Sequence, residues 1–137
     1  MKPQKITLPR QLWQTMREQV SNDAPLESCG LVAGRGERAE QVCPITNMLA
    51  SPVRFRMDPR EQLQAFEAIE ACGLELLAIY HSHPNGPEIP SKTDMEESLY
   101  DVVNLIWSPR NGEWSLRAFW LEKNKATEIP IMMQDDS

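Results

Sequence analysis

Cysteine and histidine are scarce in this 137-residue sequence, which has three of the first and two of the second. The cysteines, Cys29, Cys43 and Cys72, are odd in number and lack the CxxC spacing of a zinc ribbon, which argues against a disulfide framework. We therefore expect buried thiols in a reducing compartment. The Pro-Cys-x-x-Cys pair that zinc deaminases use is missing as well, and so is a glycine-rich phosphate loop.

Basic charge is also in deficit, because 14 lysines and arginines face 20 aspartates and glutamates, for a net charge of −6. A surface that binds nucleic acid needs a basic excess, so this composition argues against a nucleic-acid partner. No apolar run reaches the about 18 residues of a membrane span, and residues 1–5 lead into no apolar segment of a secretory signal. We therefore expect a cytoplasmic protein that does not cross a membrane.

Both histidines stand in one short His-x-His-Pro motif, at His81 and His83. The motif follows the apolar run 76–80, which predicts a buried strand. Successive side chains on a strand point to opposite faces, so His81 and His83 project from one face and can bind one ion. Two histidines at this spacing also occur in strands as exposed imidazoles, so the pair alone leaves both interpretations open.

A third ligand is expected a few residues further on. Residues 84–90, rich in proline and glycine, predict a loop, after which Ser91 opens a helix that carries Asp94. A hydrolytic zinc site has three protein ligands and one open position, so Asp94 is the candidate third ligand. Ser-x-x-Asp is also a helix-start pattern, in which Ser91 caps the helix and Asp94 favours the helix dipole. The two interpretations are compatible, because a carboxylate in the first turn is held beside the loop.

An upstream Glu-x-Cys-Gly motif places Glu27 at the mouth of the apolar stretch 27–33, which predicts another strand. A charged residue in this position is ordinarily an exposed strand end. On a strand Cys29 shares a face with Glu27, which allows a position near the metal, although a small residue packed in the sheet is the simpler interpretation.

Taken together, these motifs resemble the JAMM metallopeptidase family (MPN-plus, JAB1, Mov34), in a short prokaryotic-type form. The resemblance covers most of the chain, although outside the motifs it depends on the order of elements alone. It implies a zinc ion bound by His81, His83 and Asp94, with Glu27 as general base and Ser91 as a hydrogen-bond donor to the oxyanion.

The resemblance further implies hydrolysis of a peptide or isopeptide bond. For a short chain without large insertions, it implies a bond that follows the Gly-Gly tail of a ubiquitin-like sulfur-carrier protein. Two alternatives stay open: a non-catalytic MPN-type interaction module, and a zinc amidohydrolase acting on another peptide substrate. The complete set of five motif residues favours the enzyme. The sequence does not identify the sheet edge that receives the substrate.

The apolar pattern predicts a single α/β domain in residues 1–133, in which about three helices flank one mixed sheet. This is similar to the cytidine-deaminase-like fold of the JAMM family. Residues 134–137 are expected to form an acidic, disordered tail. The expected helices cover 9–20, 59–72 and 91–99. The expected strands cover 6–8, 27–33, 41–46, 53–57, 76–80, 102–107, 114–121 and 128–133, with a turn at 108–112.

Overall fold

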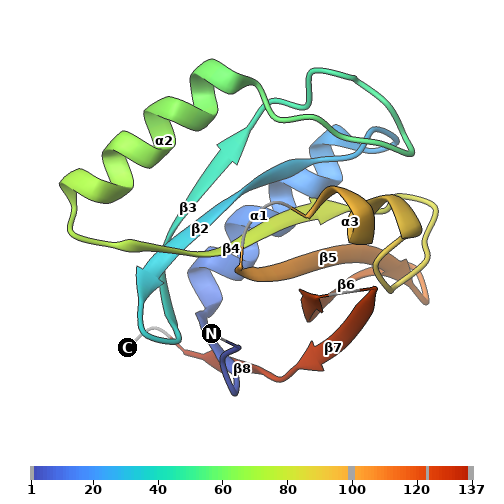
Figure 1. Cartoon of the computed structure of the whole chain (residues 1–137). Coiled ribbons are helices and arrows are strands. Elements are labelled where there is room, and N and C mark those ends of the chain that lie inside the picture. Colours follow the sequence, from blue (N-terminus) through green and yellow to red (C-terminus); the bar gives the residue numbers. More distant parts are fainter. Residues whose placement is uncertain (1, 99–100, 123, 136–137) are drawn as a thin grey trace.

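The computed structural model of the chain describes residues 2–98, 101–122 and 124–135. Its helices are α1 (Arg10–Asp23), α2 (Pro59–Ala71) and α3 (Lys92–Glu97). Its strands are β1 (Ile6–Pro9), β2 (Cys29–Arg35), β3 (Arg38–Ile45), β4 (Glu75–Ser82), β5 (Val103–Arg110), β6 (Glu113–Glu122), β7 (Lys125–Ile129) and β8 (Ile131–Gln134). The three expected helices and the single α/β architecture are confirmed (Figure 1).

The strands form one mixed sheet in the order β7-β6-β5-β4-β2-β3-β1-β8. β4 lies near the middle, antiparallel to β2 and parallel to β5. A parallel pair needs a crossover connection, and the segment that carries α3 supplies the one between β4 and β5. The end of β4 is therefore enclosed by β2 on one side and β5 on the other.

Helices cover both faces of the sheet (Figure 1). Alternation along β2 shows how the faces are divided, because Val32 packs in the cluster with Met16 and Val20 of α1, whereas Leu31 packs in the cluster with Ile69 of α2. α2 begins where the sequence predicts, since Asp58 accepts hydrogen bonds from the first-turn backbone. The candidate site lies on the face that α2 covers.

The expected strand over 53–57 is wrong, because this segment is a loop with a single isolated bridge between Asn47 and Met57. The side chain of Asn47 takes the place of a partner strand. Its Nδ2 donates to the carbonyl oxygen of Arg54 at 3.0 Å, and its Oδ1 accepts from the backbone N–H of Arg56 at 3.0 Å. Backbone groups that a ladder would satisfy are thus satisfied by one amide.

The C-terminal strands also differ from the expectation. β5 continues through 108–110, so the turn to β6 is made at Asn111 and Gly112, both of which have positive φ. The single edge strand expected over 128–133 is divided at Pro130 into β7 and β8, which occupy the two opposite edges of the sheet. Proline has no backbone N–H for a ladder, so it suits a break between strands.

The C-terminal boundary differs as well. Gln134 belongs to β8 and pairs with Pro9, and Asp135 forms an ion pair with Arg10 at 2.8 Å. Gln134 is therefore part of the sheet and not of a disordered tail. Residues 136–137 lie outside the described residues, as does Leu99, which the sequence places at the end of the third helix.

The thiols are free but not all buried: Cys29 is buried, Cys43 is intermediate and Cys72 is exposed. The expectation of buried thiols is wrong for Cys72, which follows the last turn of α2. Across residues 2–98, 101–122 and 124–135, none of the helices has the length and apolar character required to cross a membrane.

Candidate active site

The two histidines lie where β4 ends. His81 is the residue before the last one of β4 and is 1% exposed. His83 follows the strand and is 6% exposed. The backbone N–H of His83 donates to the carbonyl oxygen of Trp107 at 2.8 Å, which continues the pairing with β5. This bond keeps the chain extended beyond the strand, so both imidazoles point to the same side, as predicted.

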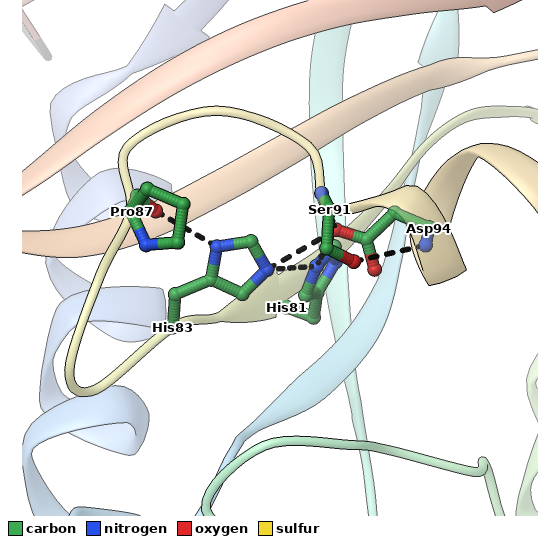
Figure 2. A network of polar contacts seen from close by, with 5 residues as sticks. All are labelled: His81, His83, Pro87, Ser91 and Asp94. Carbon is green, nitrogen blue, oxygen red and sulfur yellow. Dashed lines mark hydrogen bonds and ion pairs between the residues drawn. The ribbon is translucent and has the colours of Figure 1, made fainter. Parts of the chain in front are cut away.

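Asp94 reaches the histidines from the first turn of α3. Ser91 and Asp94 form a capping box, in which Ser91 Oγ accepts from the backbone N–H of Asp94 at 3.0 Å and Asp94 Oδ2 accepts from the backbone N–H of Ser91 at 2.8 Å. The same Oδ2 lies 3.2 Å from His81 Nε2 and 3.1 Å from His83 Nε2. Figure 2 shows the three side chains converging. The capping interpretation is confirmed, and the same geometry is compatible with the ligand interpretation, which stays a prediction.

The three convergent atoms have the character of a metal-binding group. His81 Nε2 and His83 Nε2 are 3.0 Å apart, so each of the three atoms is within 3.2 Å of the other two. The group combines two imidazoles and a carboxylate, each offering one ligand atom, on buried or half-buried residues. Three acceptor atoms at one point repel one another unless protons or a cation lie between them, so the group fits a metal site.

Neighbouring groups fix the orientation of both imidazoles. His83 Nδ1 lies 2.8 Å from the carbonyl oxygen of Pro87, which can only accept, so the proton is on Nδ1 and Nε2 is left as a ligand (Figure 2). The ring of Phe55 stacks on His81 with 4.7 Å between the ring centroids. Sequence reasoning missed both contacts, because a carbonyl carries no residue signature and Phe55 was assigned to a strand.

The electrostatics of the group favour an ionised carboxylate. Burial alone would raise the pKa of Asp94, but the hydrogen bonds with His81 and His83 outweigh burial and hold that pKa well below its usual range. Burial lowers the pKa of His83, but the hydrogen bonds with Asp94 and with the carbonyl of Pro87 outweigh it, so the pKa of His83 is raised. A metal bound at Nε2 would replace the second proton that the charged His83 imidazole carries there, and the proton on Nδ1 would stay.

Glu27 lies just outside β2, separated from it by Ser28, and is not the exposed strand end that a charge usually marks, because it is only 5% exposed. Burial raises the pKa of Glu27 to about 7, a change that His83 opposes and Asp94 reinforces. Ser82, between the two histidines, holds this segment in place: its Oγ accepts from the backbone N–H of Ser28 at 2.8 Å. The sequence offered no signal for that role of Ser82.

Cys29 lies opposite His81 in the β2–β4 pairing. Its Sγ donates to the carbonyl oxygen of Ile45 at 3.4 Å, and the residue belongs to the apolar cluster under α2. Burial raises the pKa of the Cys29 thiol to about 12, and nearby carboxylates add to the effect. A protonated, packed thiol matches the simpler interpretation of this residue.

Two cavities lie at the site. The acidic cavity has a volume of about 450 Å³, and the residues that line it include Gln19, Asp23, Glu27, Ile45, Thr46 and Glu61. The histidine cavity has a volume of about 320 Å³, and the residues that line it include Phe55, Met57, Ile79, His81, Asp94 and Asn104. The first contains the candidate base, and the second contains two members of the metal-binding group.

Comparison with known proteins assigns the family. Residues 9–122 match the family described as prokaryotic homologs of the JAB domain. This chain belongs to that family. A Thermus thermophilus protein named probable TtuB-protein conjugate cleaving protease is 39% identical over 93% of this chain and 83% of its own length. A Pyrococcus furiosus protein named desampylase is 40% identical over 84% of this chain and 81% of its own length.

The fold of this JAB-family chain also has a counterpart among solved structures. The solution structure of a Desulfitobacterium hafniense protein is 32% identical and has a TM-score of 0.86, covering 96% of this chain and 94% of the other. The predicted family and fold are therefore confirmed, and the predicted enzyme class agrees with the protease named among the relatives. The roles of the five motif residues stay predictions, although the structure brings four of them within one network and Glu27 close enough to influence two of their charges.

Proposed function

We propose that this JAB-family protein is a zinc metallopeptidase that hydrolyses the amide bond following the Gly-Gly tail of a ubiquitin-like sulfur-carrier protein. The observation that carries the proposal is the convergence of His81, His83 and Asp94 beside the buried carboxylate of Glu27. Three ligands with one open position, next to a base, are what metal-assisted hydrolysis requires.

The separations within the group support zinc as the metal. The ligands of a tetrahedral zinc site, about 2.0–2.2 Å from the ion, lie about 3.3 Å from one another. The three separations among His81, His83 and Asp94 are 3.0, 3.1 and 3.2 Å, close to that value before any ion is added. The hydrogen bond from His83 Nδ1 to the carbonyl of Pro87 supplies the outer contact that zinc-binding imidazoles use.

Glu27 moves the proton in the proposed reaction. Zinc, when bound, supplies a Lewis acid and lowers the pKa of water to about 7. The carboxylate of Glu27 accepts a proton from the attacking water, whose oxygen bonds to the scissile carbonyl carbon. Glu27 then returns this proton to the nitrogen as the carbon–nitrogen bond breaks, so the products are a carboxylate and a free amine. Burial raises the pKa of Glu27 to about 7 in the metal-free protein. A nearby cation would lower that pKa, which favours the ionised carboxylate that can accept the proton.

Ser91 supplies the donor for the negative oxygen that forms during attack. Its Oγ is an acceptor in the capping box, so the hydroxyl hydrogen remains to be donated. Because α3 and the strand-end loop hold Ser91 beside Asp94, this donor is in place before the substrate arrives. A preorganised donor of this kind contributes about 10²–10³ in rate.

The substrate class rests on the family and on the relatives' names. The Thermus thermophilus relative is named as a protease that cleaves conjugates of TtuB with proteins, and we transfer conjugate cleavage to this chain as a proposal. A Gly-Gly tail suits a narrow approach to the metal, because glycine has no Cβ to clash with the walls. The cytoplasmic location stays a prediction.

The proposal is tested with a carrier protein whose Gly-Gly tail is extended by a peptide, and with a Leu-Leu version of the same tail. The zinc-loaded enzyme should cut the first after the second glycine and leave the second intact, as read from the masses of the products. If the enzyme cleaved both carriers equally, it would be an amidohydrolase that does not recognise the Gly-Gly tail. If the zinc-bound protein cleaved neither carrier, the non-catalytic module of the same fold would be the better interpretation.

A further inference from the structure

The two cavities divide the substrate between them, if the proposed function holds. The nitrogen of the scissile bond must come within hydrogen-bond reach of Glu27, because Glu27 returns the proton to it. Glu27 lines the acidic cavity, whereas His81 and Asp94 line the histidine cavity. The amine side of the substrate therefore lies in the acidic cavity, and the Gly-Gly tail lies in the histidine cavity.

The acidic cavity carries carboxylates without matching cations. Asp23 accepts from the hydroxyl of Ser28 at 2.5 Å, and Glu61 accepts from the backbone N–H of Thr46 at 2.9 Å. Neither carboxylate forms an ion pair within the described residues, and the lining described for this cavity contains no lysine, arginine or histidine. The hydrogen-bond donors of both carboxylates are therefore neutral groups, so the negative charges of Asp23 and Glu61 at this cavity are not balanced by a cation.

A second observation indicates that the acidic cavity awaits a ligand. Glu27 is 5% exposed, and within the described part of the chain no hydrogen-bond donor reaches its carboxylate. Among the described residues, the backbone groups of Glu27 form its hydrogen bonds, with Ser51 and Asn47. Asp23, Glu27 and Glu61 line this one cavity, so the three carboxylates surround the same space.

We infer that the acidic cavity selects the amine side of the substrate by charge, favouring neutral or cationic groups and rejecting a free carboxylate next to the scissile bond. Like charges at short range repel, so Asp23 and Glu61 oppose any substrate in which a single amino acid with its α-carboxylate follows the Gly-Gly tail. An isopeptide bond to a lysine side chain places no carboxylate there. The substrate class is therefore a protein conjugate, and a carrier–amino acid adduct is disfavoured.

The test compares two substrates that differ in one charge: a carrier whose Gly-Gly tail ends in alanine, and the same carrier ending in alanine amide. The zinc-loaded wild type should cleave the amide with a kcat/KM about tenfold higher than the free acid. The double variant Asp23→Asn/Glu61→Gln should bring that ratio within about twofold, because both substitutions keep the size and the accepted hydrogen bond but remove the charge. Glu61→Gln alone should lower the ratio in part, which keeps the test valid if Asp23→Asn disturbs folding.

A matched control uses the exposed carboxylates of the same two helices. Glu18→Gln/Glu67→Gln removes the same charge from α1 and α2 outside the cavity, so it should retain the tenfold ratio. Equal cleavage of acid and amide by the wild type, or a ratio that the cavity variants leave unchanged, would overturn the inference while leaving the proposed function intact. Failure to cleave either substrate, with zinc bound, would overturn the proposed function and this inference with it.

Discussion

One carboxylate oxygen of Asp94, Oδ2, belongs both to the helix cap and to the candidate metal-binding group. It accepts from the backbone N–H of Ser91 at the start of α3, and it faces both histidines. Asp94→Ala should therefore weaken zinc binding by at least about 100-fold, because removal of a ligand costs more than removal of an outer contact. The fold should persist, since the core lies in the sheet and under the longer helices. Zinc content after dialysis, with circular dichroism to verify folding, measures this.

A control for Asp94→Ala is Glu96→Gln, which removes a carboxylate from the same helix. Glu96 is 59% exposed and its only described ion pair, with Lys92, spans 3.9 Å, so the substitution should leave zinc content unchanged. Wild-type zinc affinity in folded Asp94→Ala would remove this residue from the ligand set.

The raised pKa of Glu27 predicts a pH dependence of stability in the metal-free protein. Burial favours the protonated carboxyl, whose pKa rises from 4.5 to about 7, so the contribution of Glu27 to folding is fully present below pH 4.5 and is lost as the pH rises through 7. Glu27→Gln stays neutral and avoids this loss. At pH 8 the variant should be more stable than wild type by about 2–3 kcal/mol, and at pH 4.5 about equally stable.

Urea unfolding at the two pH values, in the presence of a chelator, measures this difference. If the free energy of unfolding differed between wild type and Glu27→Gln by the same amount at both pH values, ionisation of Glu27 would not destabilise the folded protein, which would contradict the prediction.

The motifs and the family resemblance named five candidate site residues, but they did not indicate the residues that hold these five in place. The orienting contact on His83 comes from a backbone carbonyl, that of Pro87, which any residue would offer. Ser82 accepts a hydrogen bond from Ser28, next to Glu27, because β2 and β4 are neighbours in the sheet. The sequence of a strand does not show which distant strand it pairs with.

At the scale of elements, local signals predicted the helices well, but they failed for the strand expected over 53–57 and missed the break at Pro130. Asp58 and Pro59 begin α2, and Ser91 begins α3, because capping is a local hydrogen-bond requirement that the sequence displays directly. The segment 53–57 alternates like a strand, yet the amide of Asn47 satisfies its backbone. A competition between a side chain and a partner strand is decided by tertiary structure, so alternation could not reveal it.

Ser91 has two roles in this account, cap of α3 and donor to the oxyanion, and each has its own measurement: the stability of the protein for the cap and kcat for the donor. Ser91→Ala removes both, so it should destabilise α3 by about 1 kcal/mol and lower kcat by about 10²–10³, with zinc still bound. Ser91→Thr keeps a hydroxyl and should restore most of both. Zinc content and steady-state rates for the two variants check this, and a Ser91→Ala enzyme with wild-type kcat would exclude Ser91 as the oxyanion donor.

At the scale of the whole molecule, the sheet brings together groups from three separate parts of the chain. Glu27 precedes β2, the histidines lie at the end of β4, and Asp94 lies in the first turn of α3, and these segments meet because β2 pairs with β4. The fold class was predictable from alternating strands and helices. The strand order was not, since β7 and β8 are separated by Pro130 alone and yet lie at opposite edges of the sheet.

Metal-dependent hydrolysis driven by Glu27 is tested most directly by cleaving one carrier–peptide conjugate in ¹⁸O-labelled water. Zinc-loaded wild type should release a carrier that ends in the second glycine and has gained one heavy oxygen, and the chelated protein should release none. Zinc-loaded Glu27→Gln should keep one zinc per chain and cleave about 10²–10⁴ more slowly. An intact conjugate after incubation with the zinc-loaded wild type, or cleavage by Glu27→Gln at the wild-type rate, would contradict the account.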